Sequence, residues 1–387
     1  MSLRFLTAGE SHGRALVGIL EGIPAGLEVT AEAIHAELRR RKTGHGRGDR
    51  QRIEDDAVEI LSGVRHGRSL GSPIALVIWN RDWASWENIM QAEPATGEVE
   101  RQVDIPRPGH ADLVGGIKYG HDDMRNVLER ASARETAMRV ALASVARLFL
   151  TEIGVEVSSR VVAIGGVEDE APVELPVSDW TLRTEASPVR CLDPAAGAAM
   201  VAAIDAAAAA GDTLGGVFET SAAGLPLGLG SHVHWDRRLE AEIGRAFLSL
   251  NAIKGVEVGL GFRLASLPGS AAHDELFPGE RGAVVRESNR AGGLDGGITT
   301  GEPLVVRAAM KPISTLKNPL GSVNRRTGQA VKAHYERSDV CAVPSAAVIG
   351  ESLLVLVVAE ALLQKFGGDS MAEIRPRIED WRRQTRA

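Results

Sequence analysis

Two short segments place a histidine among other groups that can move protons. Residues 9–13 read Gly-Glu-Ser-His-Gly, so His12 stands between glycines that permit tight backbone geometry and close approach of a ligand. Residues 107–112 read Arg-Pro-Gly-His-Ala-Asp, and the Pro-Gly turn is expected to hold His110 outward. Because imidazole titrates near neutral pH, the pair His12 and His110 suggests general acid–base chemistry.

A cluster of cations follows in a chain whose net charge is −7. Its members are Arg39, Arg40, Arg41, Lys42, Arg47, Arg50 and Arg52. The first four would complement the C-terminal dipole of a helix. The other three lie within or just after the glycine-rich loop 44–48, where we expect a mobile basic flap. Such a concentration in an acidic protein predicts a focused site for a small, highly charged anion.

Cations also precede two long apolar segments. Arg130 and Arg134 lie four apart at the expected start of a helix, on one face, where the dipole attracts anions instead. Either Glu129 and Glu135 neutralise them, or the site holds a phosphate or carboxylate. The segment 337–339, Arg-Ser-Asp, occupies the same place before the next long helix. This recurrence suggests a pseudo-symmetric anion site.

Other local patterns are less specific. The segment 311–315, Lys-Pro-Ile-Ser-Thr, follows an expected strand and either binds an anion or forms a turn. His232 and His234 could share one face of a strand, but no matching Cys or Asp cluster accompanies them, so a metal site is not expected. We interpret the tryptophans of 79–86 as packing residues. Walker A and Gly-x-Gly-x-x-Gly motifs are both absent from the sequence.

Composition sets the broad class. Of 387 residues, 44% are apolar and 25% charged, as in ordinary globular proteins. The apolar run 353–363 is too short to span a bilayer, and from residues 1–7 we expect no secretion signal. Two cysteines, Cys191 and Cys341, form no disulfide framework, which fits a reducing cytoplasm.

Strand and helix patterns mix without strict alternation, which favours an α+β fold. Strands are expected over 15–21, 57–61, 74–79, 155–164, 216–219, 256–262 and 304–310. Helices are expected over 30–42, 132–153, 202–210 and 345–366. A faint internal repeat relates about 1–153 to 214–366, and no linker separates the halves. We therefore expect one integrated domain over 1–387.

Three long segments resemble the chorismate synthase family. They are Gly9-Glu-Ser-His-Gly with Gly22-Ile-Pro24, the run from Glu129 to Ser144, and Arg337-Ser-Asp-Val-Cys with Gly350-Glu-Ser-Leu353. The resemblance spans nearly the whole chain. It implies a β-α-β sandwich built by pseudo-twofold repetition, usually a homotetramer. It also implies a carbon–oxygen lyase of the shikimate pathway to aromatic amino acids.

That lyase converts 5-enolpyruvylshikimate 3-phosphate to chorismate and phosphate by a 1,4-elimination that requires reduced FMN. The substrate carries roughly −3 to −4 charges near neutrality. By resemblance, His12 would protonate or stabilise reduced flavin, His110 would assist the departing phosphate, and Asp339 would help remove the ring proton. The flavin contacts would be Arg130, Ala131, Ser132, Asn251, Ala252, Gly296, Lys311, Pro312, Ile313, Ser314, Thr315 and Arg337.

The resemblance also assigns anion contacts and partners. Arg41 and Arg47 match positions for NADPH or substrate anions, and Arg134 would clamp the substrate. NADPH is a candidate reductant. We expect a cytoplasmic protein that takes reduced FMN from an external flavin reductase and binds neither nucleic acid nor membranes.

Two rival functions use the same segments. The pattern Gly-x-Ser-x-Gly around Ser11 fits the nucleophile elbow of serine hydrolases, but that elbow needs several preceding strands, and at most one short strand precedes Ser11. An RNA-binding protein could use the segment from Arg39 to Arg52. It would bind generic RNA with a steep salt dependence.

Overall fold

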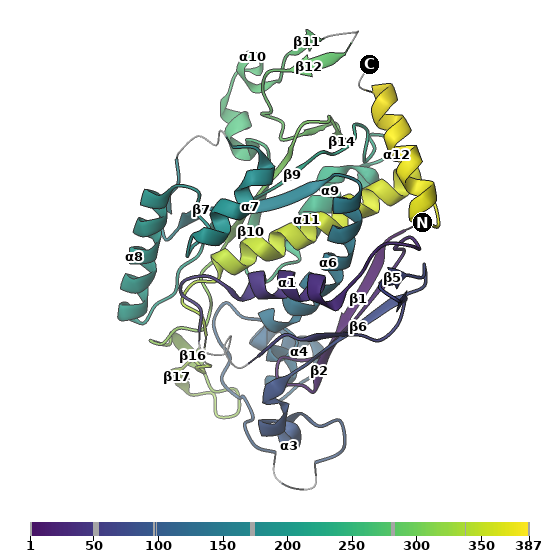
Figure 1. Ribbon diagram of the computed structural model, residues 1–387. Coiled ribbons are helices and arrows are strands. Elements are labelled where there is room, and N and C mark those ends of the chain that lie inside the picture. Colours follow the sequence, from purple (N-terminus) through teal and green to yellow (C-terminus); the bar gives the residue numbers. More distant parts are fainter. Residues whose placement is uncertain are drawn as a thin grey trace.

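Two antiparallel sheets enclose a layer of helices (Figure 1). The computed structural model describes residues 2–48, 54–95, 97, 99–170, 175–279, 283–336 and 338–385. Within this part of the chain, the four-stranded sheet has the order β1-β2-β6-β3 and the five-stranded sheet the order β10-β15-β9-β7-β8. Helix α6 packs on the first sheet and α11 on the second, and the two helices contact each other.

The strands of the first sheet are β1 (Arg4–Ala8), β2 (Ala15–Glu21), β3 (Val58–Ile60) and β6 (Ile74–Trp79). Those of the second are β7 (Glu156–Ile164), β8 (Val167–Glu168), β9 (Gly216–Ala223), β10 (Ile253–Val258) and β15 (Leu304–Met310). Four hairpins complete the described strands: β4 (Val64–Arg65) with β5 (Arg68–Ser69), β11 (Leu276–Pro278) with β12 (Val284–Arg286), β13 (Leu294–Asp295) with β14 (Ile298–Thr299), and β16 (Gly321–Val323) with β17 (Ala330–Lys332).

The described α-helices are α1 (Ala31–Lys42), α3 (Glu87–Met90), α4 (Asp112–Tyr119), α5 (Arg125–Leu128), α6 (Thr136–Glu152), α7 (Val177–Ala186), α8 (Pro194–Ala210), α9 (Leu239–Leu248), α10 (Gly269–Ala272), α11 (Val343–Phe366) and α12 (Met371–Thr385). Short 3₁₀ turns are η1 (Arg81–Ser85), η2 (Ala133–Glu135), η3 (Trp235–Arg237) and η4 (Gly261–Ser266).

Side-chain alternation in β2 explains how the first sheet joins the helix layer. Leu16 and Leu20 are buried towards the helices, whereas Val17 and Ile19 point to the opposite face. Between the two leucines lies Gly18, where an added Cβ would come within 2.6 Å of the Met138 sulfur of α6. Helix α6 therefore packs directly on the strand backbone.

The helix layer is apolar nearly all round. Helix α1 begins where the Thr30 hydroxyl accepts a hydrogen bond from the Ala33 N–H at 3.2 Å, and it buries Ile34 and Leu38. Helix α11 has 24 residues and is long and apolar enough to cross a membrane by composition, yet 89% of its most apolar window is buried inside the protein. The apolar run at 353–363 thus belongs to a longer core helix.

The two sheets share one topology. In chain order, β1, β2, β3 and β6 take the spatial order β1-β2-β6-β3, and β7, β9, β10 and β15 take the equivalent order β7-β9-β15-β10. Helices α1 and α9 follow the second strand of each set, and α6 and α11 follow the last. The second half was expected to begin at about 214, but β7 at 156 is the equivalent of β1. By strand order, we therefore propose repeat halves of 4–152 and 156–366, with α7 and α8 inserted into the second.

Most expected elements are present. Strands at 15–21, 74–79 and 304–310 have the expected bounds, and the alanine-rich helix extends from 194 to 210. The strand expected over 256–262 is wrong at its end, because the chain turns at Gly259 and Gly261, which have positive φ values of 60° and 49°. The pair His232 and His234 lies on an exposed bend and not on a strand.

A buried charge network ties the helix layer to the second sheet. The Glu351 carboxylate of α11 is fully buried and accepts hydrogen bonds from Arg40 at 2.8 Å, Arg147 at 2.6 Å and the Ser159 hydroxyl at 2.6 Å. Burial alone would raise the pKa of Glu351, but the charges of Arg40 and Arg147 outweigh it and lower the pKa to about 2. The carboxylate is therefore ionised throughout the neutral range.

Replacing Glu351 with glutamine is expected to lower the free energy of unfolding by about 3–5 kcal/mol, because two partly buried guanidinium groups lose their one fully buried counter-charge and keep only Glu37 and Glu185 as carboxylate partners. Urea unfolding followed by circular dichroism measures the change. The control is Glu242→Gln, which removes an exposed pair with Arg245 and should change stability by less than about 1 kcal/mol. Equal stability of the two variants would contradict the role of the network.

Candidate active site

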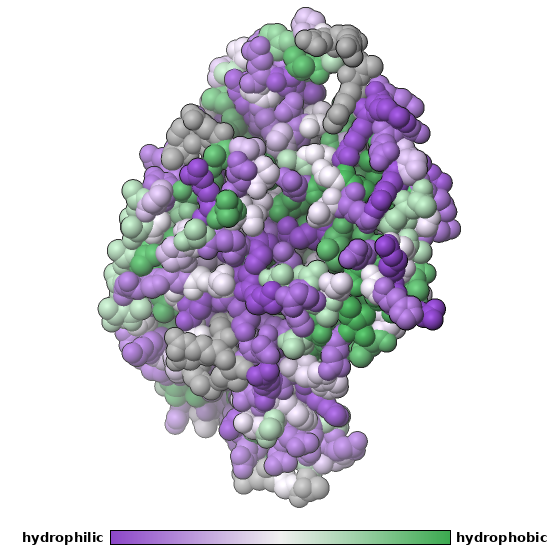
Figure 2. All heavy atoms as spheres, in the orientation of Figure 1, coloured by the Kyte–Doolittle hydropathy of each residue, from purple (hydrophilic) through white to green (hydrophobic). Residues whose placement is uncertain are grey.

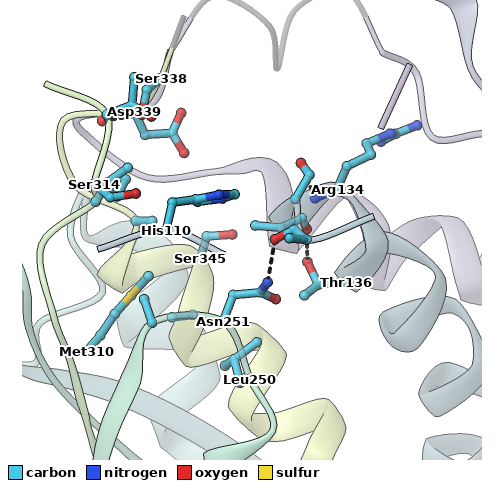
Figure 3. A pocket seen from close by; sticks show the side chains of 18 of the residues that line it. His110, Arg134, Thr136, Leu250, Asn251, Met310, Ser314, Ser338, Asp339 and Ser345 are labelled. Carbon is cyan, nitrogen blue, oxygen red and sulfur yellow. Dashed lines mark hydrogen bonds between the residues drawn. The ribbon is translucent and has the colours of Figure 1, made fainter. Parts of the chain in front are cut away.

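A cavity of about 480 Å³ lies where the N-terminal ends of α6 and α11 meet (Figure 3). Residues of η2 and the first turn of α6 line one part of it, and residues 338–349 line another. Its volume is typical of sites for small molecules and cofactors. Because free N–H groups and the positive dipole end lie at a helix N-terminus, two such ends favour a bound anion.

The charges around the cavity strengthen this preference. Six cationic side chains and three carboxylates are found among its described lining residues. The cations are Arg41, Arg47, Arg107, Arg134, Lys254 and Lys311, and the acids are Glu54, Glu336 and Asp339. The local excess is positive although the whole chain has a net charge of −7. A low-dielectric cavity with this excess concentrates anions.

His12 is held on two sides. Its Nδ1 lies 2.9 Å from both carboxylate oxygens of Glu129, and its backbone N–H donates to the same carboxylate at 2.8 Å. Its ring stacks on the Trp86 indole, with centroids 3.8 Å apart and planes at 21°. Of the tryptophans of 79–86 that we interpreted as packing residues, Trp86 is buried and packs against a residue of the site, whereas Trp79 is 46% exposed.

Glu129 is itself fixed by Arg125. The Arg125 guanidinium donates to Glu129 at 2.9 Å, four residues along the chain, and lies 5.0 Å from the centre of the Trp86 indole. Burial would raise the pKa of Glu129, but hydrogen bonds and charge from His12, with a further bond from Arg125, hold it below its usual value. The carboxylate is thus ionised beside His12.

His110 has the same kind of partner. Its Nδ1 lies 2.5 Å from the Asp112 carboxylate, which is fully buried and also accepts from Arg107 Nε at 2.8 Å. Burial would raise the pKa of Asp112, but the bonds from His110 and Arg107 hold it well below its usual range. Arg107 also donates to the Thr315 hydroxyl at 3.0 Å, which joins this group to the segment 311–315.

The glycine-rich loop 44–48 reaches Asp339. Arg47 donates to the Asp339 carboxylate at 2.5 Å, and the Gly48 N–H donates at 2.7 Å. Backbone bonds from His45 N–H to the Pro188 carbonyl and from Val340 N–H to the Gly46 carbonyl anchor the loop. The mobility expected of the flap stays a prediction, and Arg50 and Arg52 lie outside the described residues.

Arg134 and Arg41 line the cavity with donors already in use. Arg134 bonds to Asp56 and donates to the Asn80 side-chain oxygen at 2.9 Å. Figure 3 shows its side chain extending away from His110. Arg41 donates to the Thr136 hydroxyl at 2.9 Å, and burial lowers its pKa to about 10. Because these N–H groups already have partners within the protein, Arg41 and Arg134 contribute mainly positive charge to the cavity.

A second wall of the cavity comes from the later half of the chain. The Asn251 side chain donates to the Ala131 carbonyl at 2.9 Å, and the Lys311 N–H donates to the Ala252 carbonyl at 2.9 Å. Ala252 has a φ of 68°, a left-handed conformation that is uncommon for alanine and often marks functional turns. Ser132 and residues 311–315 also line this wall, beside Leu250, Met310 and Ile349.

Three of the residues expected at the flavin site are not among the described lining residues. Arg130 donates to the Gly9 and Thr7 carbonyls at 3.0 and 2.9 Å. The expectation that it shares a helix face with Arg134 is wrong, since α6 begins only at Thr136. Gly296 is exposed in the turn between β13 and β14, and Arg337 lies outside the described residues.

Sequence reasoning missed several residues of the site. Glu129 entered only as a neutraliser of Arg130, and Asp112 only as a neighbour of His110. The signal for Asp112 was its spacing of two residues from His110, whereas Glu129 lies 117 residues from His12. Lys254 carried no local signal. Among the described residues, no group of three or more His, Cys, Asp or Glu could hold a metal ion.

The fold is an α+β sandwich whose cavity is lined by two histidines and an excess of cationic side chains, which is typical of an enzyme site for a small molecule. The family model for chorismate synthase matches residues 3–363, and the chain belongs to this family. Chorismate synthase from Thermobifida fusca (strain YX) is 55% identical over 380 residues, with 96% of each chain covered. A crystal structure of chorismate synthase superimposes with a TM-score of 0.80 at 44% identity, covering 100% of this chain and 99% of the other.

A second relative, chorismate synthase from Bacillus cytotoxicus, is 53% identical over 381 residues, covering 97% of this chain and 98% of its own. The expected α+β sandwich is confirmed. Family membership implies a flavin cofactor and a small-molecule substrate. The hydrolase alternative is unsupported, because residues 9–13 connect two antiparallel strands and not a strand to a helix. RNA binding is likewise unsupported, since Arg39, Arg40 and Arg47 are paired with carboxylates.

Proposed function

We propose that this protein eliminates phosphate from 5-enolpyruvylshikimate 3-phosphate to form chorismate, as a carbon–oxygen lyase that requires reduced FMN. The observation that carries the proposal is the single cavity in which His12, His110 and Asp339 meet an excess of cations. That cavity suits a substrate with two carboxylates and a phosphate.

Arg47 is the strongest candidate for a direct substrate contact. Its side chain is 10% exposed and its Nε is buried without a hydrogen-bond partner among the described residues. A buried donor left unpaired is costly, so a ligand oxygen at this point would recover that energy. Lys311 lies on the opposite wall, bonded to the Gly109 carbonyl beside His110.

The remaining lining fits a flavin. Apolar side chains of Leu250, Met310 and Ile349 can contact a flat ring, while the backbone and hydroxyl groups of 311–315 and Ser132 can bind its polar edge and phosphate. When bound, reduced FMN supplies electron density to the reacting ring without net oxidation or reduction.

The chain supplies the proton transfers. Breaking the carbon–oxygen bond leaves phosphate with the bonding electron pair, and His110 donates a proton to the departing oxygen. The ring proton passes to the Asp339 carboxylate, and the electrons of that carbon–hydrogen bond enter the new double bond. His12 holds a proton near the flavin site and stabilises negative charge there.

We further propose that FMN is reduced elsewhere, by an external flavin reductase. Arg41, one candidate NADPH contact, has its guanidinium engaged with Thr136 and the Ala133 carbonyl. A cytoplasmic location fits the two cysteines, which are both free and buried. Activity with FMN and NADPH alone, without added reductase, would contradict the external source.

We also propose that the protein is a homotetramer, and the outer face of the first sheet supports self-association. Leu6, Val17 and Ile19 lie on that face and are 70%, 39% and 43% exposed. Figure 2 shows apolar residues gathered over this region, at the right. The equivalent face of the second sheet packs against α7, where the Ser158 and Thr181 hydroxyls are 2.7 Å apart.

Leu6→Glu should therefore shift the tetramer towards smaller species in light scattering after size exclusion, because it places a charge in an apolar contact. The control is Leu182→Glu on α7, an 81% exposed apolar residue away from the sheet, which should keep the wild-type mass. An unchanged mass for Leu6→Glu would rule out this face as the interface.

Anaerobic phosphate release tests the function directly. The substrate 5-enolpyruvylshikimate 3-phosphate is mixed with the protein and either dithionite-reduced or oxidised FMN. We expect phosphate and chorismate in equal amounts with reduced FMN alone. Absence of both products, with folded protein and bound flavin, would refute the proposed reaction.

A further inference from the structure

We propose that Glu129 and Asp112 are positioning residues that keep the proton of His12 and His110 on Nδ1, so that Nε2 of each ring serves the cavity. The effect expected on kcat rests on the proposed function. The tautomers of His12 and His110 can be measured in the protein without substrate or flavin.

The two sites share an arrangement despite unrelated local folds. In each, a histidine that lines the cavity has its Nδ1 on a buried carboxylate, and an arginine donates to the same carboxylate. At His110 the Arg107 Nη2 also lies 3.1 Å from Nδ1 and 3.4 Å from Nε2. Glu129 follows α5 and takes Arg125 from four residues earlier. Asp112 opens α4 and takes Arg107 from five residues earlier.

An ionised carboxylate can only accept hydrogen bonds. It therefore fixes a proton on the facing nitrogen, whichever charge state the ring has, and leaves Nε2 as the nitrogen that exchanges protons. The carboxylates of both pairs are nearly inaccessible, with side chains 1% exposed for Glu129 and fully buried for Asp112. The histidine and then the arginine of each pair lower the pKa of the carboxylate and keep it ionised despite that burial.

A glutamine at position 129 would no longer hold the proton of His12 on Nδ1. Three donors converge on the two oxygens of Glu129: the His12 Nδ1, the His12 backbone N–H and the Arg125 guanidinium. Arg125 donates to Oε1 and the backbone N–H donates to Oε2, whereas Nδ1 lies 2.9 Å from both oxygens. Glutamine replaces one of these oxygens with an amide N–H₂ group, which lies beside Nδ1 in either orientation of the amide. Its amide N–H₂ then faces Nδ1 as a donor and favours the proton on Nε2.

The test is ¹⁵N NMR of the full-length protein labelled at histidine, in which the shifts of Nδ1 and Nε2 report the tautomer. Loss of the signal in His12→Gln and His110→Gln assigns the rings. We expect Nδ1 of both wild-type rings to carry a proton in the neutral and in the cationic state, so that only Nε2 gains and loses one. In Glu129→Gln the neutral His12 ring should shift towards the Nε2–H form, as should the neutral His110 ring in Asp112→Asn. Unchanged ring signals in both variants would overturn the inference.

Kinetics give an independent readout. With the wrong tautomer, kcat should fall about 100-fold or more while KM for the substrate stays within about threefold. Glu129→Asp retains a carboxylate and should recover part of kcat. A higher KM with an unchanged kcat would also contradict a positioning role for Glu129 and Asp112.

A matched control separates positioning from general destabilisation. Glu219 is another buried glutamate with two arginine partners, Arg160 at 2.9 Å and Arg307 at 2.6 Å, and it lies on β9 away from the cavity. Glu219→Gln should cost comparable stability and leave the ring signals and kcat unchanged. If the variants show the expected tautomer shifts but the wild-type protein forms no chorismate, the positioning role stands and the proposed reaction is refuted.

Discussion

His110→Ala is expected to lower kcat for phosphate release by about 10²- to 10⁴-fold, because the departing oxygen loses its proton donor. The KM for 5-enolpyruvylshikimate 3-phosphate should change little, since the surrounding cations remain. The effect is measured anaerobically with reduced FMN supplied in excess. The Asp112 carboxylate left behind still has Arg107 as its partner, so the variant should fold.

The chain contains a close control for this experiment. His234 pairs with Asp236 at 2.6 Å, with the same two-residue spacing as His110 and Asp112, but on an exposed bend away from the cavity. His234→Ala should retain wild-type kcat. Equal activity of the two variants would remove His110 from the reaction.

Arg47→Ala is expected to raise KM for the substrate about 10- to 100-fold, which corresponds to the loss of one charge-assisted hydrogen bond of about 1.5–3 kcal/mol. The unpaired Nε and the position of Arg47 over the cavity give the physical reason. Isothermal titration of substrate into the FMN-free protein measures the same loss without turnover.

Arg286→Ala is the matched control for Arg47. Arg286 is a partly buried arginine whose guanidinium lies 3.0 Å from Asp295, in the region of the β11–β12 hairpin. Its loss should leave KM unchanged. A substrate affinity that is equal in the Arg47 and Arg286 variants would count against the anion site at the loop 44–48.

The strands that could be predicted from sequence are short apolar runs with clear breaks at their ends. β2, β6 and β15 are mostly apolar and are flanked by polar residues, glycine or proline, which mark their bounds. β1 went unrecognised because four of its five residues are exposed and its pattern does not alternate. The start of the second long helix was placed at 132, whereas a 3₁₀ turn precedes the α-helix at Thr136.

The site was predictable where its signals are local. His12 and His110 stand out through neighbouring glycine, proline and acidic residues, and most segments carried over from the family line the cavity. What local spacing cannot show is which carboxylate faces which cation. For Arg134 the sequence left open either neutralisation by Glu129 and Glu135 or a bound anion, whereas in the fold Arg134 bonds to Asp56, 78 residues away.

The convergence of α6 and α11 on one cavity has an evolutionary consequence. If two identical halves had assembled as a symmetric dimer, both helix ends would have carried the same residues. Here one end presents Arg134 and the other presents Asp339. In a single chain that contains both proposed halves, each helix end can change separately, and here one carries a cation and the other a carboxylate. A homodimer of identical halves could not place different residues at its two helix ends.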